Sequence, residues 1–142
     1  MSKTNIYLNF PGTTEEAFNF YQSIFGGEFP GIMRYGDMPN PDQPIPEHLK
    51  NMIMHTSLMV GDMNLMGADA IEGFGPPVIY GNNFSISLTA ESTEEADKLY
   101  SELSNGGIIT MPMQKTFWGD YFGMCIDKFG INWMISYALP KE

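Results

Sequence analysis

The spacing of apolar residues predicts two similar helices in this chain. In both segments apolar residues recur at positions i, i+3, i+4 and i+7, which places them on one helix face. They are Ala17, Phe20, Tyr21 and Ile24 in the first segment and Ala96, Leu99, Tyr100 and Leu103 in the second. Each segment starts with the Ser/Thr-x-x-Glu pattern of a capping box, Thr13 with Glu16 and Ser92 with Glu95, and each closes with a glycine pair. The pattern predicts two amphipathic helices of about three turns.

Strand-like segments surround both predicted helices. "NIYLNF" precedes the first helix, and "NFSISLTA" precedes the second with Phe84, Ile86 and Leu88 alternating with polar residues. "FPGIMRY", "MIMHTSLMV" and "MNLMGAD" follow the first helix, and "IITMPMQ", "YFGMCID" and "INWMISYA" follow the second. The last two strands of the first set are separated by the tight turn Gly61-Asp62. The chain therefore reads as strand, helix and three strands, twice.

The repeat is visible in the letters themselves, because "TTEEAFNFYQSIFGG" at Thr13 returns as "STEEADKLYSELSNGG" at Ser92. We expect one domain over 1–142, with module 1 at about 1–70, a Gly/Pro-rich linker at about 71–81 and module 2 at about 82–142. A half of about 70 residues is marginally stable alone, so the modules are expected to share a core. Four prolines between Gly36 and His48 predict a surface loop.

Charge and composition limit the partners and the location. Seven basic against seventeen acidic residues leave a net charge of −10, which repels nucleic-acid phosphates and anionic membranes. No apolar run approaches the roughly 20 residues of a membrane-spanning helix. The apolar stretch after Lys3 is too short for a signal peptide, so we expect a cytoplasmic protein. One cysteine and two histidines cannot build a structural zinc site.

Several longer motifs resemble one protein family over nearly the whole chain. The motifs are "EEAFNFYQSIFGGE", "IMHTSLMVGDMNLMGAD", "GNNFSISL", "LSNGGIITMPMQKTFWGDYFG" and "DKFGINWMI". They look like the PhnB-like branch of the vicinal oxygen chelate superfamily of glyoxalases, bleomycin-resistance proteins and extradiol dioxygenases. The resemblance implies an α+β fold in which two tandem βαβββ modules form a glyoxalase/bleomycin-resistance-type half-barrel pair. It also implies a homodimer with a chamber for a small-molecule ligand.

The resemblance also implies where metal-using members hold their ion. Those ligand positions fall on or near Ile6 or Tyr7, Met66, Ser85 and Met134. Thioethers, a neutral serine and an aliphatic chain are poor ligands for a catalytic divalent ion, so no metal cofactor is expected. The branch often carries a demethylubiquinone methyltransferase label. The chain has no G-x-G-x-x-G turn of the kind that a nucleotide-like methyl donor would favour by analogy.

We therefore predict a metal-independent protein that binds a small apolar or aromatic molecule. Five residues are the candidate pocket: Tyr7, His55, Asp69, Trp118 and Tyr121. His55 could act as a general base or orient a ligand oxygen, and the aromatic rings could bury an apolar body. Each also has a structural interpretation: a histidine bonded to a neighbour, an aspartate that starts a turn, and rings that pack a core or a dimer.

Two other functions stay open at this point. One is a metal-dependent lyase, isomerase or dioxygenase with relocated ligands, for which His55 and Asp69 would need a third donor such as Glu72 or Asp120. The other is a protein whose chamber is filled by its own side chains and which acts through its surface. Twelve methionines suit an adaptable apolar pocket or a plain sheet core. Cys125, between Met124 and Ile126, is expected to be a buried, inert thiol.

Overall fold

The fold consists of two units that each contain one sheet and one α-helix. The computed structural model describes residues 2–38, 44–73 and 75–141. The two compact units are Met1–Ile79, called unit 1, and Tyr80–Glu142, called unit 2. Neither α-helix in these described ranges is long and apolar enough to cross a membrane.

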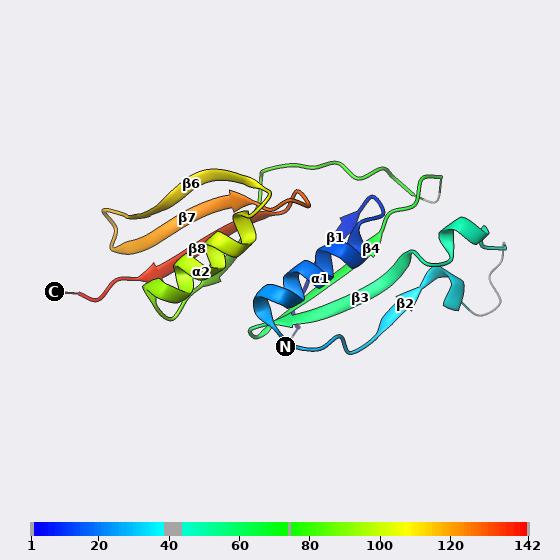
Figure 1. Ribbon diagram of the computed structural model, residues 1–142, viewed down its shortest axis with the longest axis horizontal. Coiled ribbons are helices and arrows are strands. Elements are labelled where there is room, and N and C mark those ends of the chain that lie inside the picture. The colour runs from blue at the N-terminus through cyan, green and yellow to red at the C-terminus, as the bar shows by residue number, and fades with distance from the viewer. Residues whose placement is uncertain (1, 39–43, 74, 142) are drawn as a thin grey trace. The chain divides into compact units, whose positions relative to one another are not determined.

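Unit 1 is a four-stranded mixed sheet with one covering helix (Figure 1). Its elements are β1 (Ile6–Phe10), α1 (Thr14–Phe25), β2 (Ile32–Arg34), the 3-10 helices η1 (Tyr35–Asp37) and η2 (Glu47–Leu49), β3 (Ile53–Val60) and β4 (Met63–Asp69). The strand order is β1-β4-β3-β2. Strand β1 runs parallel to β4, and the other two pairings are antiparallel. The two-residue turn at Gly61, which has a positive φ of 62°, joins β3 to β4 as expected.

Unit 2 repeats this arrangement. Its elements are β5 (Ile86–Thr89), α2 (Thr93–Ser104), β6 (Ile108–Lys115), β7 (Asp120–Ile126) and β8 (Asn132–Ala138). The strand order β5-β8-β7-β6 and the parallel β5–β8 pairing match unit 1 strand for strand. The two tandem βαβββ modules predicted from the sequence are therefore confirmed. The prediction that they share one core stays a prediction.

Helix α1 covers its sheet with a slightly different face from the one predicted, whereas the buried residues of α2, Ala96 and Leu103, both lie on the predicted face. In α1 the buried residues are Thr14, Ala17, Phe18 and Tyr21. Phe20 and Ile24, which the spacing placed on the buried face, are only half-buried. Phe18 takes their place because its ring lies against Gly67 of β4, where there is no side chain to displace it.

The capping box expected at the first helix is absent. Thr13 is the N-cap of α1, yet its side chain caps nothing. The backbone N–H of Thr14 donates to the Asp69 carboxylate at 3.0 Å. A residue distant in the sequence therefore satisfies a free N–H group at the start of the helix. At α2 the prediction holds in part, since Ser92 Oγ accepts from Glu95 N–H at 3.0 Å. The Glu95 carboxylate reaches the N–H of Glu91, one residue before the N-cap, at 3.4 Å.

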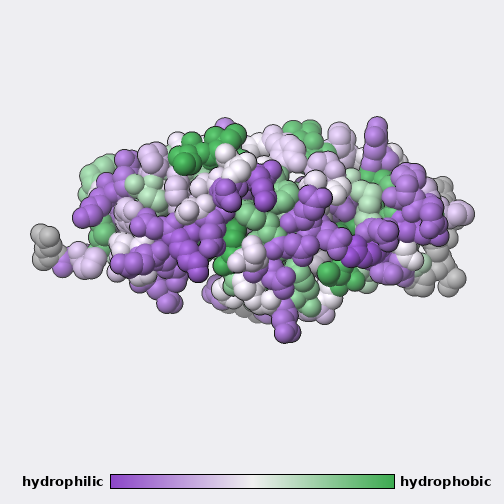
Figure 2. Space-filling model, in the orientation of Figure 1, coloured by the Kyte–Doolittle hydropathy of each residue, from purple (hydrophilic) through white to green (hydrophobic). Residues whose placement is uncertain are grey.

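Two other predicted segments differ in extent. Strand β5 begins only at Ile86, and Phe84, which was expected to be half-buried within it, is exposed. The proline-rich loop predicted between Gly36 and His48 lies partly outside the described residues, and its described ends contain η1 and η2. The outward side of both helices is mainly hydrophilic (Figure 2), as their acidic sequences require.

Gly67 should be essential for packing α1 on its sheet. A Cβ at this position would lie 2.6 Å from Cε2 of Phe18, whereas a Cβ at Gly31 would meet nothing within 4 Å. We expect Gly67→Ala to lower the free energy of unfolding by about 1–3 kcal/mol through overpacking, and Gly31→Ala to change it little. Urea denaturation followed by circular dichroism measures both variants. Equal stabilities of the two would contradict the packing described for Phe18.

Candidate functional site

In each sheet one face packs on the α-helix of its unit, and no α-helix of the described residues covers the other. Strand residues alternate between the two faces, so the buried Leu8, Phe10, Leu58 and Leu65 mark the helix side of the first sheet. We call the opposite side the helix-free face. In unit 1 it carries the residues that alternate with this core: Tyr7, Asn9, Met33, His55, Ser57, Met59, Asn64, Met66 and Ala68. This face combines apolar bulk with one imidazole, one phenol, one serine and two amide side chains.

Tyr7 and His55 meet on this helix-free face although they are far apart in the sequence. Their ring centroids are 5.8 Å apart with an interplanar angle of 35°. Strand β4 lies between their strands, so the ring contact spans β4. Tyr7 stays 46% exposed, and partial burial raises the pKa of its phenol. An aromatic ring beside an imidazole can stack a flat ligand and give it one hydrogen-bonding partner.

Met66 and Ser57 complete the centre of the face. Met66 is in register with Tyr7 on one side and with Ser57 on the other. Ser57 is nearly buried, with 9% of its surface exposed, while Met33 and Met59 at the edges of the patch are about half exposed. Sequence reasoning did not select Met33, because a three-residue edge strand such as β2 gives no clear alternation.

Asp69 lies on the opposite side of the sheet from His55. It is 4% exposed and in register with the buried Phe10. One carboxylate oxygen accepts from the N–H of Thr14 at 3.0 Å and the other from the N–H of Ile53 at 2.8 Å. Both oxygens therefore hold the backbone, and the structure does not bring Asp69 together with His55.

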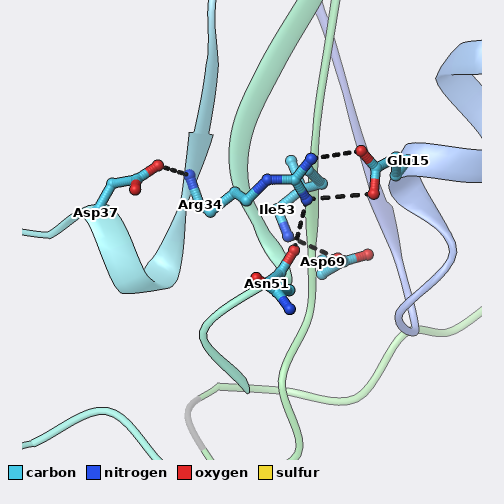
Figure 3. Close-up of polar contacts among 6 residues, drawn as sticks. All are labelled: Glu15, Arg34, Asp37, Asn51, Ile53 and Asp69. Atoms are coloured by element: carbon cyan, nitrogen blue, oxygen red, sulfur yellow. Dashed lines mark hydrogen bonds and ion pairs between the residues drawn. The ribbon is translucent and has the colours of Figure 1, made fainter. Parts of the chain in front are cut away.

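An ion pair joins β2 to the start of α1 near this carboxylate. Figure 3 shows that both terminal nitrogens of the Arg34 guanidinium donate to the Glu15 carboxylate. Nη1 also donates to the carbonyl of Asn51 at 2.7 Å. The hydrogen bond from Arg34 lowers the pKa of Glu15. The Tyr35 hydroxyl donates to the backbone carbonyl of Asp69 at 3.1 Å, and burial raises the pKa of that phenol. These contacts hold the edge strand to the helix without using any group of the helix-free face.

The helix-free face of unit 2 is also apolar at its centre. It carries the residues that alternate with the buried Ile86, Trp133, Ile135 and Cys125, namely Ser87, Thr89, Met111, Gln114, Phe122, Met124, Met134 and Ser136. Trp118, in the turn between β6 and β7, lies with its ring centroid 6.0 Å from that of Phe122. It remains 54% exposed, and its indole N–H donates to Asp120 at 3.1 Å. Trp118 is thus held by the turn and available to a ligand.

Tyr121 points to the other side of the same sheet. Its hydroxyl donates to the carboxylate of Asp97 on α2 at 2.6 Å, and this hydrogen bond raises the pKa of the phenol. The structure therefore separates Tyr121 from Trp118 and brings Phe122 beside Trp118 instead. The strand alternation could have predicted this separation. Tyr121 lies four residues before the buried Cys125 and therefore on the same face, whereas Phe122 lies three residues before it and on the other face.

The donor set at the implied metal positions does not fit a catalytic divalent ion. In unit 1 these positions bring Tyr7 and Met66 into register, and in unit 2 the partner of Met134 is Ser87, two residues beyond Ser85. Thioether and neutral hydroxyl groups are weak ligands for hard or borderline divalent metals. Within residues 2–38, 44–73 and 75–141, no group of three or more His, Cys, Asp or Glu side chains could hold an ion. His55 and Asp69 lie on opposite faces of one sheet, so they cannot bind the same ion as the relocated-ligand hypothesis requires.

Cys125 is buried as expected, with 1% of its surface exposed. Burial, with a smaller contribution from Asp127, raises its pKa to about 11, so the thiol is protonated at neutral pH. It belongs to the core under α2 and offers no nucleophile to the helix-free face.

Comparison with known proteins gives a consistent set of similarities. The family model described as 3-demethylubiquinone-9 3-methyltransferase matches residues 2–136. Protein YjdN of Escherichia coli (strain K12) is 31% identical over 137 residues, covering 92% of this chain and 91% of YjdN.

Solved structures resemble the fold over nearly its full length. Protein PA1353 from Pseudomonas aeruginosa has a TM-score of 0.83 and 35% identity, covering 99% of this chain and 100% of that one. A putative 3-demethylubiquinone-9 3-methyltransferase, PhnB protein, from Bacillus cereus has a TM-score of 0.78 and 28% identity, covering 96% and 100%. A glyoxalase/bleomycin resistance protein/dioxygenase family enzyme from Burkholderia phytofirmans PsJN, at 17% identity, TM-score 0.59 and 94% and 97% coverage, shares the fold alone.

Asp69 should stabilise unit 1 through the two backbone groups that it binds. In Asp69→Asn one carboxylate oxygen becomes an NH₂ group that faces a backbone N–H and cannot accept from it. We expect the free energy of unfolding to fall by about 1–3 kcal/mol. Asp62→Asn, in the exposed turn after β3, is the matched control and should behave like the unmodified protein. Urea denaturation measures both, and an unchanged midpoint for Asp69→Asn would refute the structural role.

Proposed function

Because this chain belongs to the family whose model is described as 3-demethylubiquinone-9 3-methyltransferase, the PhnB-like branch of the vicinal oxygen chelate superfamily, we propose that it binds a small apolar or aromatic molecule without a metal ion. The observation that carries the proposal is the Tyr7–His55 ring pair on the helix-free face of unit 1. Met66 lies beside Tyr7 at the position where metal-using relatives are expected to hold a ligand to their ion.

The chemistry of both helix-free faces supports this class of ligand. Methionine side chains adapt to ligands of different shape, and aromatic rings provide large contact areas at low entropic cost. In unit 1 an aromatic ring and a methionine lie side by side, Tyr7 and Met66. In unit 2 two aromatic rings lie together, Trp118 and Phe122. His55 adds one polar group that can orient a ligand oxygen or accept a proton. Asp69 and Tyr121, which have partners on the helix sides, are not part of the proposed pocket.

The methyltransferase description receives no support from the local structure. The turn from β1 to α1, Pro11 to Thr13, has one glycine, whereas the dinucleotide-type phosphate loop requires three at G-x-G-x-x-G spacing. The sheets are mixed four-stranded sheets with a helix on one side only, in contrast to the doubly wound parallel sheet of that fold.

The proposal also includes a cytoplasmic location and a homodimer. The sheet edges favour association, because β6 is an edge strand on which Ile108 and Ile109 are exposed. Figure 2 shows hydrophobic surface over this strand.

Ligand binding can be tested with the methionines as reporters. Thermal-shift screening of EDTA-treated protein against apolar and aromatic metabolites should yield stabilising compounds. In spectra of ¹³C-methyl-methionine protein, these compounds should move the Met66 and Met134 signals. We expect His55→Ala to weaken binding roughly tenfold through loss of one ring and one hydrogen bond. Asn19→Ala, at an exposed position of α1 outside the helix-free face, is the control and should bind normally.

Two results would overturn this function. One is a screen in which no compound stabilises the protein. The other is a stoichiometric transition metal, found by elemental analysis of protein purified without added metal, whose removal abolishes binding.

Self-association can be measured by sedimentation equilibrium. We expect the mass of two chains at micromolar concentration and a weaker dimer for Ile109→Lys, because the substitution places a charge on an apolar edge. Ile79→Lys, at another exposed isoleucine, is the matched control. A single-chain mass at every concentration would refute the dimer.

The location can be tested by fractionating cells of the protein's own host. Recovery of the protein outside the cytoplasmic fraction would refute the cytoplasmic location.

A further inference from the structure

A pocket of about 480 Å³ lies at one end of the unit 1 sheet. Its lining residues follow the ends of β1 and β4 or precede the start of β3, and they are Pro11, His48, Leu49, Met52, Ala70, Ile71 and Glu72. A volume between roughly 300 and 1,000 Å³ is typical of small-molecule sites. None of these seven residues belongs to either helix-free face, so the pocket has a lining of its own.

The backbone that carries the lining is tied together by hydrogen bonds. The N–H of Ala70 donates to the carbonyl of Phe10 at 2.7 Å, which joins the segment after β4 to the end of β1. The N–H of Met52 donates to Leu49 at 3.1 Å, and the carbonyl of Met52 accepts from Tyr35 at 3.0 Å. The segments that line the pocket are thus held in place before any ligand arrives, which reduces the entropic cost of binding.

The lining defines the chemistry of the occupant. Five of the seven side chains are apolar, and the two polar ones are the imidazole of His48 and the carboxylate of Glu72. Lys50, the cation closest in sequence to His48, is already paired with Glu47 at 2.8 Å. Glu72 is exposed at the rim and is the one carboxylate among these seven residues, so the local charge is negative, and the net charge of −10 has the same sign. Such a site attracts a cation and repels an anion.

We propose that this pocket binds a small apolar molecule that carries a protonated amine. Glu72 accepts hydrogen bonds from the ammonium group, and Met52 and Ile71 contact the apolar body. This assignment does not rest on the function proposed above, because it uses other residues and another ligand class.

Three probes of similar size and different charge test the proposal: 2-phenylethylamine, 2-phenylethanol and phenylacetate. The readout is the ¹³C-methyl signal of Met52, assigned with Met52→Leu. The amine should move this signal at the lowest concentration, the alcohol at a higher one and the anion at the highest. The signals of Met66 and Met134, which lie on the helix-free faces, report separately on binding there, so the order of the three probes is read from Met52 alone.

Two charge variants sharpen the test. Glu72→Gln should weaken binding of the amine roughly tenfold, because a charge-assisted hydrogen bond is lost, and should leave the affinity for the alcohol unchanged. Glu72→Lys should reverse the order so that phenylacetate binds best. Glu28→Gln removes the same charge from an exposed position outside the lining and should leave all three probes unchanged.

The following results would overturn the proposal. They are an unmoved Met52 signal with all three probes, equal affinity for amine and anion, or equal weakening by Glu28→Gln and Glu72→Gln. If the amine moved Met66 or Met134 and left Met52 in place, this pocket would be excluded while the function proposed for the helix-free faces would stand.

Discussion

One helix can cover only one face of a four-stranded sheet, and the described residues of each unit contain a single α-helix. The helix side becomes a conventional core, closed by residues such as Phe18 and Leu65 in unit 1 and Trp133 in unit 2. The other side keeps an apolar surface that a second sheet, another chain or a ligand must cover. The candidate function of the protein follows from this constraint.

The polar groups of unit 1 divide according to the same two sides. On the helix side, both carboxylate oxygens of Asp69 accept hydrogen bonds from backbone N–H groups, one in α1 and one in β3. At the edge, Arg34 holds Glu15 and the carbonyl of Asn51. These interactions hold strands and helix in register and leave Tyr7 and His55 to the helix-free face. Charged residues thus build the framework, and weakly polar or apolar residues form the surface where a ligand could bind.

The composition of the helix-free faces restricts the chemistry that can occur there. Tyr7, Met66, Ser87 and Met134 provide no oxygen or nitrogen set suited to a hard divalent ion. His55 supplies the imidazole of the unit 1 face, which can form a hydrogen bond with a ligand. Binding of an apolar or aromatic molecule is the activity that these groups support directly. The end pocket near Glu72 differs from both faces, since it combines an apolar lining with a carboxylate.

The order of elements, the internal repeat and the family resemblance could be determined from the sequence alone, because helix spacing, strand alternation and glycine turns act over a few residues. Only the tertiary structure decided which side chains meet. Asp69 replaced the local cap of α1, and Tyr7 came to lie beside His55. These outcomes depend on the register between strands far apart in the chain, as between β1 and β4, and a shift of one residue exchanges the two faces of a strand. Local patterns carry no record of that register, so the sequence predicted the sheets but not the faces on which their chemistry lies.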